Sequence, residues 1–474
     1  MKLADLRSFA SLLLVGASLW GCGGDPAPDR PRNVILFVVD TLRADRLGAY
    51  GYPRPTTPTI DRFALSGTVY ERNRSQAPWT VPSMISMMTG LYVTDEEQVL
   101  PPNVPTLAER VQDTGRTTAA FVGNMVLTTD RGFERGFDHF EYISATRARR
   151  VVDRFVQWHR AAESRLDDGF FAWLHPLDPH TPYDPKPGDD VFDGPRPEQA
   201  ELERRWARDM PRVEELAGPS TPLPLEGAID YIEEKSNLYD GEVWAVDQAF
   251  ARLLKYLRET GLYEETTIVF AADHGELLWE YPKYPQELQA RIDRENGLPL
   301  GIADLYAFGH RAWYFPELWN TPLIIAGPGF PSGQRRTGLS GNLDIFPTLM
   351  SLLEADWEAD TPGVDLSGGA DPTRERIFAH GFETSAVLER DGEQLVEYAP
   401  IRFQLPADAP SPRELFDLNT GPELVDLGDD RPETRERMAE ELRAWRQQHA
   451  RELTIEVIGE EAEAALRALG YLED

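Results

Sequence analysis

The chain has 474 residues, of which 41% are hydrophobic and 11 are Trp, so it is long enough to bury a large core. Its 48 basic and 80 acidic residues give a formal net charge of −32, and such a surface repels phosphate backbones. The composition therefore indicates a globular protein and argues against a nucleic-acid partner. The length favours one large α/β domain with a smaller one over a set of small modules.

The amino-terminal segment predicts export. Two basic residues precede an apolar run from Phe9 to Trp20, which has the length of a secretory signal and is too short to span a membrane. Cys22, the only Cys of the chain, follows this run, and the segment resembles the lipobox of bacterial lipoproteins, apart from the bulky Trp20. We predict a signal peptide at 1–21 and a flexible tether at 22–32. Lipidation of Cys22 would anchor the protein to a membrane of the bacterial cell envelope, and an ordinary signal peptide with an incidental Cys is the alternative.

Beyond the tether, strand-like and helix-like segments alternate. The run NVILFVVD at 33–40 is apolar until it ends in a carboxylate, which is typical of a buried parallel strand. Similar strands are expected in RTTAAFVGN, GFFAWLHP, TTIVFAAD and TPLIIAG, with helical segments such as DGEVWAVDQAFARLLKYLRETG between them. This alternation predicts a mostly parallel sheet that is covered by helices on both faces and binds ligands at the carboxyl ends of its strands.

One hydroxyl, that of Thr80, stands directly before a helical run. In APWTVPSMISMMTG, at 77–90, Thr80 precedes Val-Pro-Ser, which suits an N-cap because Pro in the first turn loses no hydrogen bond. The same place, at the positive end of a helix dipole, favours an attacking alkoxide. The sequence leaves both functions open, and one residue can serve as both.

Two strand ends carry side chains of the types that commonly bind metals. Asp40 closes the first strand, and Asp273 with His274 closes TTIVFAAD. Carboxylate and imidazole groups suit a divalent cation, and polar groups after long apolar strands are costly if they stay unpaired. Either Asp alone could cap the loop that follows it, but the three residues together favour a metal cluster, whose ion could be Ca, Mn, Zn or Mg.

Other polar residues are weaker candidates. His175 and Asp178, in LHPLDPHTPY, follow an apolar run and fit either a strand-end site or a loop held by its prolines. Asp240, Glu242 and Asp247, in YDGEVWAVD, fit a solvated helix face better than a ligand set.

Several segments, in their order along the chain, resemble the sulfatases of the alkaline phosphatase superfamily. The likeness begins in VVDTLRADRLGAYGYPRPTTPTIDRF and continues through FERGFDHF, LHPLDPHTPY, LYDGEVWAVDQAFARLL, FAADHGE, FGH, TPLIIAGPG, LDIFPTLMSLL and RELFDLNTGPELVDL. It covers about residues 33–452. The resemblance implies an α/β fold: an alkaline-phosphatase/sulfatase-like mixed sheet sandwiched by helices, with a smaller C-terminal sheet-and-helix subdomain. We expect a catalytic domain at 33–355 and a C-terminal subdomain with terminal helices at 356–474.

The resemblance also implies a nucleophile and its metal. Asp40, Asp273 and His274 look like the ligands of a divalent cation, and Thr80 stands at the position of the nucleophile, which is itself a ligand.

Further positions resemble those that hold the substrate. His180, in DPHTPY, is similar to a histidine that contacts the anionic head of the ester, and His310 or its neighbour Arg311 lies where the family keeps a cationic anion-holder. Asn124, in VGNM, stands in the stretch that supplies Lys and His to the sulfate in sulfatases, and is expected to bind substrate.

Three positions depart from the sulfatase pattern. The CxPxR or SxPxR motif, whose first residue is oxidised to formylglycine, reads TVPSM here, so that Thr80 replaces the aldehyde precursor and Met84 replaces the Arg. A second ligand Asp is replaced by Thr41. Phosphoethanolamine and phosphoglycerol transferases of the same superfamily use a threonine alkoxide on a metal, because coordination activates a poor nucleophile and screens the anionic ester.

Three functions therefore fit the sequence. The first is a lipid-anchored, metal-dependent hydrolase or transferase that acts through Thr80 on an anionic phosphate or sulfate ester of a small molecule, glycan or lipid. The second is a sulfuric ester hydrolase that works without formylglycine. The third is a surface-tethered binding protein that kept the fold and lost catalysis.

Overall fold

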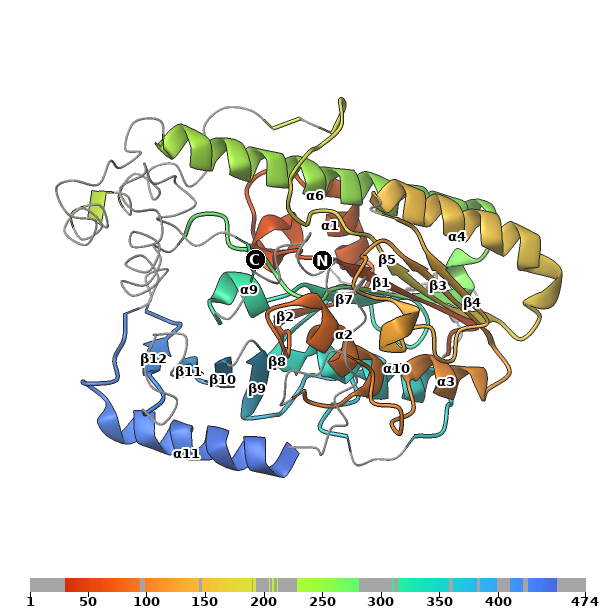
Figure 1. The fold of residues 1–474 in the computed structure, drawn as a ribbon. Coiled ribbons are helices and arrows are strands. Elements are labelled where there is room, and N and C mark those ends of the chain that lie inside the picture. Colours follow the sequence, from red (N-terminus) through yellow and green to blue (C-terminus); the bar gives the residue numbers. More distant parts are fainter. Residues whose placement is uncertain are drawn as a thin grey trace, which may run out of the picture.

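A computed structural model gives the fold of most of the chain (Figure 1). It describes residues 30–93, 99–144, 147–189, 191–192, 204, 207–208, 211, 228–280, 309–310, 314–357, 361–381, 384–398, 410–420 and 425–449. The predicted lipidation site, Cys22, and the predicted anion-holder Arg311 lie outside these residues. Among the helices of the described ranges, none combines the length and apolar character that crossing a bilayer requires.

A large mixed sheet forms the centre of the molecule. Its order is β4-β3-β5-β1-β6-β7-β2-β8, and β7 is antiparallel to both of its neighbours while every other pair is parallel. The strands are β1 (Asn33–Val39), β2 (Thr68–Arg74), β3 (Thr117–Val122), β4 (His139–Tyr142), β5 (Phe170–His175), β6 (Thr266–Ala272), β7 (Leu323–Ala326) and β8 (Gln334–Gly341). The predicted mixed α/β fold is confirmed.

Helices cover both faces of this sheet (Figure 1). One face packs against α1 (Pro58–Leu65), α4 (Ala148–Ala162) and the long α6 (Ala228–Glu259); the other packs against α2 (Thr80–Thr89), α3 (Leu107–Gln112) and α10 (Ile345–Leu353). The short turns of 3₁₀ helix are η1 (Ala44–Arg46), η2 (Gly48–Tyr50), η3 (Thr129–Arg131), η4 (Glu163–Arg165), η5 (Tyr263–Glu265), η6 (Asn342–Asp344) and η7 (Ser367–Gly369).

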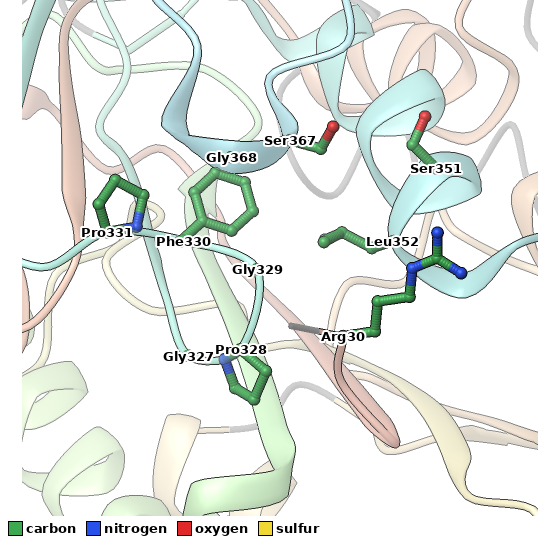
Figure 2. Close-up of a pocket in the computed structure, with 10 residues that line it drawn as sticks. All are labelled: Arg30, Gly327, Pro328, Gly329, Phe330, Pro331, Ser351, Leu352, Ser367 and Gly368. Atoms are coloured by element: carbon green, nitrogen blue, oxygen red, sulfur yellow. The ribbon is translucent and has the colours of Figure 1, made fainter. Parts of the chain in front are cut away.

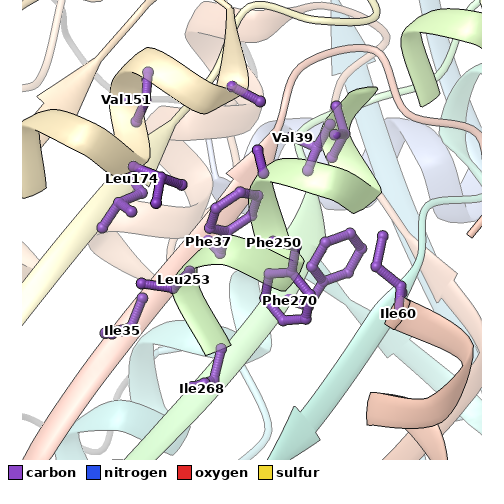
Figure 3. Packing of buried hydrophobic residues seen from close by; sticks show 14 of the residues in the cluster. Ile35, Phe37, Val39, Ile60, Val151, Leu174, Phe250, Leu253, Ile268 and Phe270 are labelled. Carbon is purple, nitrogen blue, oxygen red and sulfur yellow. The ribbon is translucent and has the colours of Figure 1, made fainter. Parts of the chain in front are cut away.

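The two faces of β1 enter separate apolar clusters because side chains alternate along a strand. Ile35, Phe37 and Val39 belong to the cluster under α6 (Figure 3), and the residues between them belong to the cluster under α2. In the first cluster, the rings of Phe37 and Phe270 stack at 5.8 Å, and Phe250 meets both edge-on. All these side chains are fully buried, which explains why β1 reads as a continuous apolar run.

A second, antiparallel sheet lies beside the first and has the order β12-β11-β10-β9. Its strands are β9 (Arg376–Gly381), β10 (Thr384–Glu389), β11 (Glu393–Tyr398) and β12 (Arg413–Asp417). One face packs on α11 (Pro432–His449), where Trp445 stacks on Phe378 at 5.0 Å, and the other packs on the short α9 (Pro316–Trp319). This arrangement matches the expected smaller sheet-and-helix part, while the exact boundary at residue 355 stays a prediction.

Candidate active site

The predicted metal-binding residues gather at the carboxyl ends of neighbouring strands. Asp40 follows β1, and Asp273 with His274 follows β6; the two strands pair in parallel with Val39 opposite Ala272. His175 is the last residue of β5, the other neighbour of β1. All four side chains are fully buried. The topology therefore brings residues from three distant parts of the chain to one edge of the sheet, where α/β proteins bind ligands.

Two carboxylates and two imidazoles surround one point at this edge. The Nε2 atom of His175 lies 3.4 Å from Asp40 Oδ2 and 3.9 Å from Asp273 Oδ2. The Nε2 atom of His274 lies 3.6 Å from Asp273 Oδ2 and 4.0 Å from Asp40 Oδ1. Asp40, His175 and Asp273 are mutually close enough to share an ion. His274 stands equally close, so we include it in the donor set.

Two oxygens of this cluster lack a hydrogen-bond donor. Among the described residues, Asp40 Oδ1 and Asp273 Oδ2 are buried without a partner, whereas Asp273 Oδ1 accepts the backbone N–H groups of Thr41 and His274. A buried carboxylate oxygen without a donor is costly, and the usual compensation is a paired charge or a metal. Because a divalent cation would satisfy both oxygens at once, the residues present fit such an ion.

The electrostatics of the cluster agree with this fit. Burial opposes the ionisation of Asp40, but the hydrogen bond with His175 and the nearby imidazoles of His180 and His274 outweigh it and hold the pKa of Asp40 below its usual range. Burial raises the pKa of Asp273 well above its usual range, and the negative charge of Asp40 adds to this shift. Two buried carboxyl groups this close cannot both ionise without a compensating charge. A cation between them would stabilise the state in which both are ionised.

His274 presents a lone pair to the same point. Burial lowers the pKa of His274 well below its usual range, so the ring is neutral at physiological pH. Its Nδ1 lies 2.9 Å from the carbonyl oxygen of Gly275, which fixes the proton on Nδ1 and leaves Nε2 as an acceptor. A backbone carbonyl that orients the ring in this way is a common feature of metal-binding histidines.

Thr80 directs its hydroxyl at the cluster. Its Oγ1 lies 3.2 Å from His274 Nε2, and the side chain is fully buried. Thr80 is the first residue of α2, and the N-cap of that helix is Trp79. Of the two possibilities that the sequence left open, the structure does not show the N-cap, because Trp79 holds that position. The helix begins one residue earlier than a cap at Thr80 requires, and this places the hydroxyl inside the first turn, beside the positive end of the helix dipole.

Asn124 links the nucleophile position to the first carboxylate. Its Nδ2 donates a hydrogen bond of 2.5 Å to Asp40 Oδ2 and lies 3.4 Å from Thr80 Oγ1, while its Oδ1 accepts from the backbone of Val126. The Asn124 amide thus contacts both side chains and fixes the position of Asp40 relative to Thr80. Its predicted contact with substrate stays a prediction.

The two predicted substrate-contacting histidines adjoin the cluster. The ring of His310 lies 4.4 Å from that of His274 and 4.9 Å from that of His180, measured between centroids. The Nδ1 atom of His310 is 3.0 Å from Glu276 Oε1, and burial raises the pKa of Glu276 to about 8. His180 Nδ1 lies 2.6 Å from the carbonyl oxygen of Thr181.

Sequence reasoning ranked one member of this cluster too low and missed another. His175 was a weak candidate, although its place at the end of an apolar strand was visible in GFFAWLH. Glu276 was not singled out, although it stands two residues after His274 in DHGE. Both are fully buried titratable residues in the structure, and both touch a predicted site residue.

The acidic residues of α6 are not a solvated face, so that expectation is wrong. Asp240, Glu242 and Asp247 are all buried, with exposures of 0%, 2% and 0%. Glu242 pairs with Arg147 at 2.7 Å, and Asp247 Oδ1 accepts two backbone N–H groups at the start of α1. Because other elements pack against this side of α6, its acids serve as internal anchors.

Met84, which the resemblance sets at the position of the sulfatase Arg, is an apolar core residue. It is fully buried in the apolar cluster between α2 and the sheet. Met84 thus packs with apolar neighbours, and no polar contact of Asp40, Thr80 or His274 among those found in the described residues involves it.

A cavity of about 590 Å³ lies apart from the site (Figure 2). Its lining includes Arg30, Phe330, Leu352 and the turn at 327–329 that follows β7. Because β7 runs antiparallel to β6, its carboxyl end lies at the opposite edge of the sheet from Asp273. No strand-end residue of the candidate site lines this cavity.

Comparisons with known proteins agree with this geometry. The family model described as Sulfatase matches residues 32–355. A low-salt glycan biosynthesis sulfotransferase of Haloferax volcanii is 25% identical over 339 residues, which are 70% of this chain and 64% of that protein. An N-acetylgalactosamine-6-sulfatase of Sus scrofa is 24% identical over 398 residues, covering 75% of this chain and 68% of the relative.

Solved structures show the same fold. A protein in complex with its substrate D-glucosamine-2-N,6-O-disulfate aligns with a TM-score of 0.67 at 18% identity, over 89% of this chain and 98% of that one. The phosphonate monoester hydrolase of Agrobacterium radiobacter aligns with a TM-score of 0.64 at 19% identity, over 89% and 96% of the two chains. At 18% and 19% identity, these alignments show a shared fold and nothing further.

Proposed function

Because the chain belongs to the sulfatase family, we propose that it is a metal-dependent hydrolase or transferase that attacks a phosphate or sulfate ester with the hydroxyl of Thr80. The observation that carries this proposal is the position of Thr80 Oγ1, 3.2 Å from His274 Nε2 and beside a buried pair of carboxylates. A buried hydroxyl at a helix N-terminus, next to a metal-binding donor set, has the surroundings of an activated nucleophile.

Asp40, Asp273 and His274, with His175 as a further donor, would hold the divalent cation together with Thr80. When bound there, the ion lowers the pKa of the hydroxyl and screens the negative charge of the ester. The imidazoles of the donor set suit Zn better than Ca, Mg or Mn.

The reaction would proceed in two displacements. The Thr80 hydroxyl gives up its proton to solvent as Oγ1 bonds to the phosphorus or sulfur atom; the bond to the leaving oxygen breaks, and that oxygen takes a proton from His310, which regains it from the attacking water or acceptor in the second step. Water then attacks the threonine ester in a hydrolase, or an acceptor hydroxyl attacks it in a transferase, and Thr80 is released. His274 Nε2 faces the Thr80 hydroxyl before an ion binds, and in the loaded site both atoms would be ligands; Asn124 keeps the hydroxyl in line with Asp40.

His180 and His310 suit contact with the anionic head of the ester and with the leaving oxygen. Both rings adjoin His274, and His310 is oriented by Glu276. A histidine whose Nδ1 is fixed by a carboxyl group presents Nε2 in a defined direction, as proton transfer requires. Arg311 would add a cationic contact to the same anion.

A sulfuric ester hydrolase that works without formylglycine is the second candidate. The observation that favours it is the family match, together with relatives named as sulfatases. The intact contacts among Asp40, Thr80 and His274 argue against a binding protein that has lost catalysis. The substrate would be an anionic ester on a small molecule, glycan or lipid, met by a protein anchored through Cys22 in the cell envelope.

A panel of esters tests the proposal. The purified full chain is stripped of metal, reloaded with Zn²⁺, Mn²⁺, Ca²⁺ or Mg²⁺, and assayed on phosphate monoesters, phosphate diesters and aryl or sugar sulfates. We expect metal-dependent turnover of at least one class, and faster turnover of a phosphate ester than of any sulfate. Turnover of sulfates alone would support the second candidate, and zero turnover of every ester in every metal form would refute both.

A further inference from the structure

The residue after Asp40 has an unfavourable backbone conformation. Thr41 has a φ of 51°, in the left-handed region that β-branched residues rarely adopt. Its side chain offers no evident compensation, because Oγ1 is buried without a hydrogen-bond partner among the described residues. Such backbone strain persists only where the surrounding structure enforces it, and it concentrates at functional sites.

The unusual conformation orients a carboxylate of the site. In this conformation the N–H group of Thr41 donates to Asp273 Oδ1 at 3.1 Å, and the N–H group of His274 donates to the same oxygen at 2.8 Å. These two bonds occupy Oδ1 and leave Oδ2 facing the imidazoles of His175 and His274. If the turn after Thr41 stays in place, an ordinary φ requires the peptide plane that carries the Thr41 N–H group to rotate, and Asp273 would lose one of the two donors that fix its orientation.

Tyr239 holds Thr41 in this conformation. Its hydroxyl, which α6 brings to the turn after β1, donates to the carbonyl oxygen of Thr41 at 2.7 Å and accepts from the backbone N–H of Arg43 at 3.0 Å. The Tyr239 side chain is fully buried, and the ring of Tyr183 packs edge-on against it at 5.5 Å. The hydroxyl therefore bridges the residues on either side of Leu42 and leaves the turn little freedom.

We propose that Tyr239 is a positioning residue, which enforces the left-handed turn at Thr41 and thereby fixes the Asp273 carboxylate in the orientation that binds the divalent cation. Tyr239 touches neither the ion nor the ester, and acts only through the backbone of Thr41. The inference rests on the proposed metal site. It adds to that site a residue of α6, a helix that carries none of the proposed ligands.

A competition titration tests this role. The Zn²⁺ dissociation constant of the full chain is measured against a chromophoric chelator, for the wild type and for Tyr239→Phe. We expect Tyr239→Phe to bind Zn²⁺ about 10-fold more weakly, the usual effect of removing a group that orients a ligand. Thr41→Gly in the Tyr239→Phe background should restore most of the affinity, because Gly adopts a positive φ without strain.

Tyr50→Phe is the matched control. The Tyr50 hydroxyl also lies between backbone groups, those of Tyr70 and Leu323, but it does not contact the site. We expect Tyr50→Phe to bind Zn²⁺ like the wild type, even if it lowers the melting temperature of the metal-free protein. This comparison separates an effect on the site from a general loss of stability.

The outcomes are distinguishable. Zn²⁺ binding that is equal in Tyr239→Phe and Tyr50→Phe would overturn the role of Tyr239 while leaving the proposed function standing. An Asp273→Asn variant that binds Zn²⁺ as tightly as the wild type would overturn the metal site itself. If Tyr239→Phe does not fold, the double variant Tyr239→Phe/Thr41→Gly is measured in its place. A folded double variant that binds Zn²⁺ at least 10-fold more weakly than the wild type would contradict the strain argument.

Discussion

Thr80 Oγ1 lies 3.2 Å from His274 Nε2, across 194 residues of sequence. The contact joins the first turn of α2 to the end of β6, which is also where Asp273 stands. Because His274 Nδ1 donates to the carbonyl of Gly275, Nε2 is left as an acceptor that faces the hydroxyl of Thr80. The hydroxyl, the imidazole and the two buried carboxylates thus form a single buried polar cluster.

Replacing Asp273 should weaken metal binding and stabilise the metal-free protein. Asp273→Asn keeps an Oδ1 that accepts the N–H groups of Thr41 and His274, and it removes one of two buried carboxyl groups that repel each other. We expect the metal-free variant to melt a few degrees above the metal-free wild type. The rise in melting temperature that added metal gives the wild type should vanish.

Thermal unfolding with and without Zn²⁺ measures both effects. Asp61→Asn is the control, since Asp61 accepts hydrogen bonds from Ala49 and Thr57 away from the site. That variant should keep the full metal-dependent shift. A metal-dependent shift that survives in Asp273→Asn would contradict the assigned ligand set.

Asp247 should make the fold less stable as the pH rises. Burial raises the pKa of Asp247 from 3.8 to about 6. The folded state therefore binds this proton more tightly than the unfolded state, so the favourable contribution is complete below about pH 4 and is lost as the pH rises through about 6. Asp247→Asn carries no charge and can still accept from the backbone of Thr59 and Ile60.

Chemical denaturation across this pH range checks the prediction. At about pH 8 we expect Asp247→Asn to exceed the wild type in free energy of unfolding by about 3 kcal/mol, and the difference should shrink toward pH 4. A constant difference between the two proteins at all pH values would show that the Asp247 pKa is not raised in the folded state.

Arg147 should support the loop that carries His180. The Arg147 guanidinium pairs with Glu242 of α6 at 2.7 Å and lies 3.9 Å from Asp178, which stands two residues before His180. Arg147→Ala leaves two buried carboxyl groups without their cation and frees the loop. We expect a loss of about 10-fold in kcat/KM, because a small displacement of a group that contacts substrate is costly.

Arg154→Ala is the control for this change. Arg154 lies on α4, the helix whose N-cap residue is Arg147, and pairs with Glu141 at 2.7 Å, away from the site. Steady-state kinetics on an active ester should show no more than a twofold effect for Arg154→Ala, as expected for a surface ion pair. Equal losses in the two variants would refute a specific role of Arg147.

Much of the fold was predictable from the sequence, for a physical reason. Strands buried on both faces must be apolar throughout, so NVILFVVD and TTIVFAAD stand out, and the polar residues that end them had to meet at one edge of a parallel sheet. The predicted positions of Asp40, Asp273 and His274 agree with this reasoning. His180 and His310 came from family resemblance, since no local pattern marks them.

The sequence could not reveal features that depend on packing between distant elements. The acids of α6 have the spacing of a solvated face, and only the elements packed against α6 make Asp240 and Asp247 internal anchors. A one-residue shift in a helix start decides whether Thr80 is a cap or a first-turn residue, and this lies within the ordinary uncertainty of helix boundaries. The left-handed conformation of Thr41 is likewise imposed from outside, by Tyr239.

The central claim is that Thr80 is the nucleophile, and one comparison of turnover numbers tests it most directly. Thr80→Ala and Thr89→Ala are assayed as metal-loaded full chains on the best ester of the panel; Thr89 is a buried threonine on the same helix, whose hydroxyl bonds Ile85. We expect Thr80→Ala to lose at least about 10³-fold in kcat and Thr89→Ala to remain near the wild type. Turnover by Thr80→Ala within about 10-fold of Thr89→Ala would contradict the account.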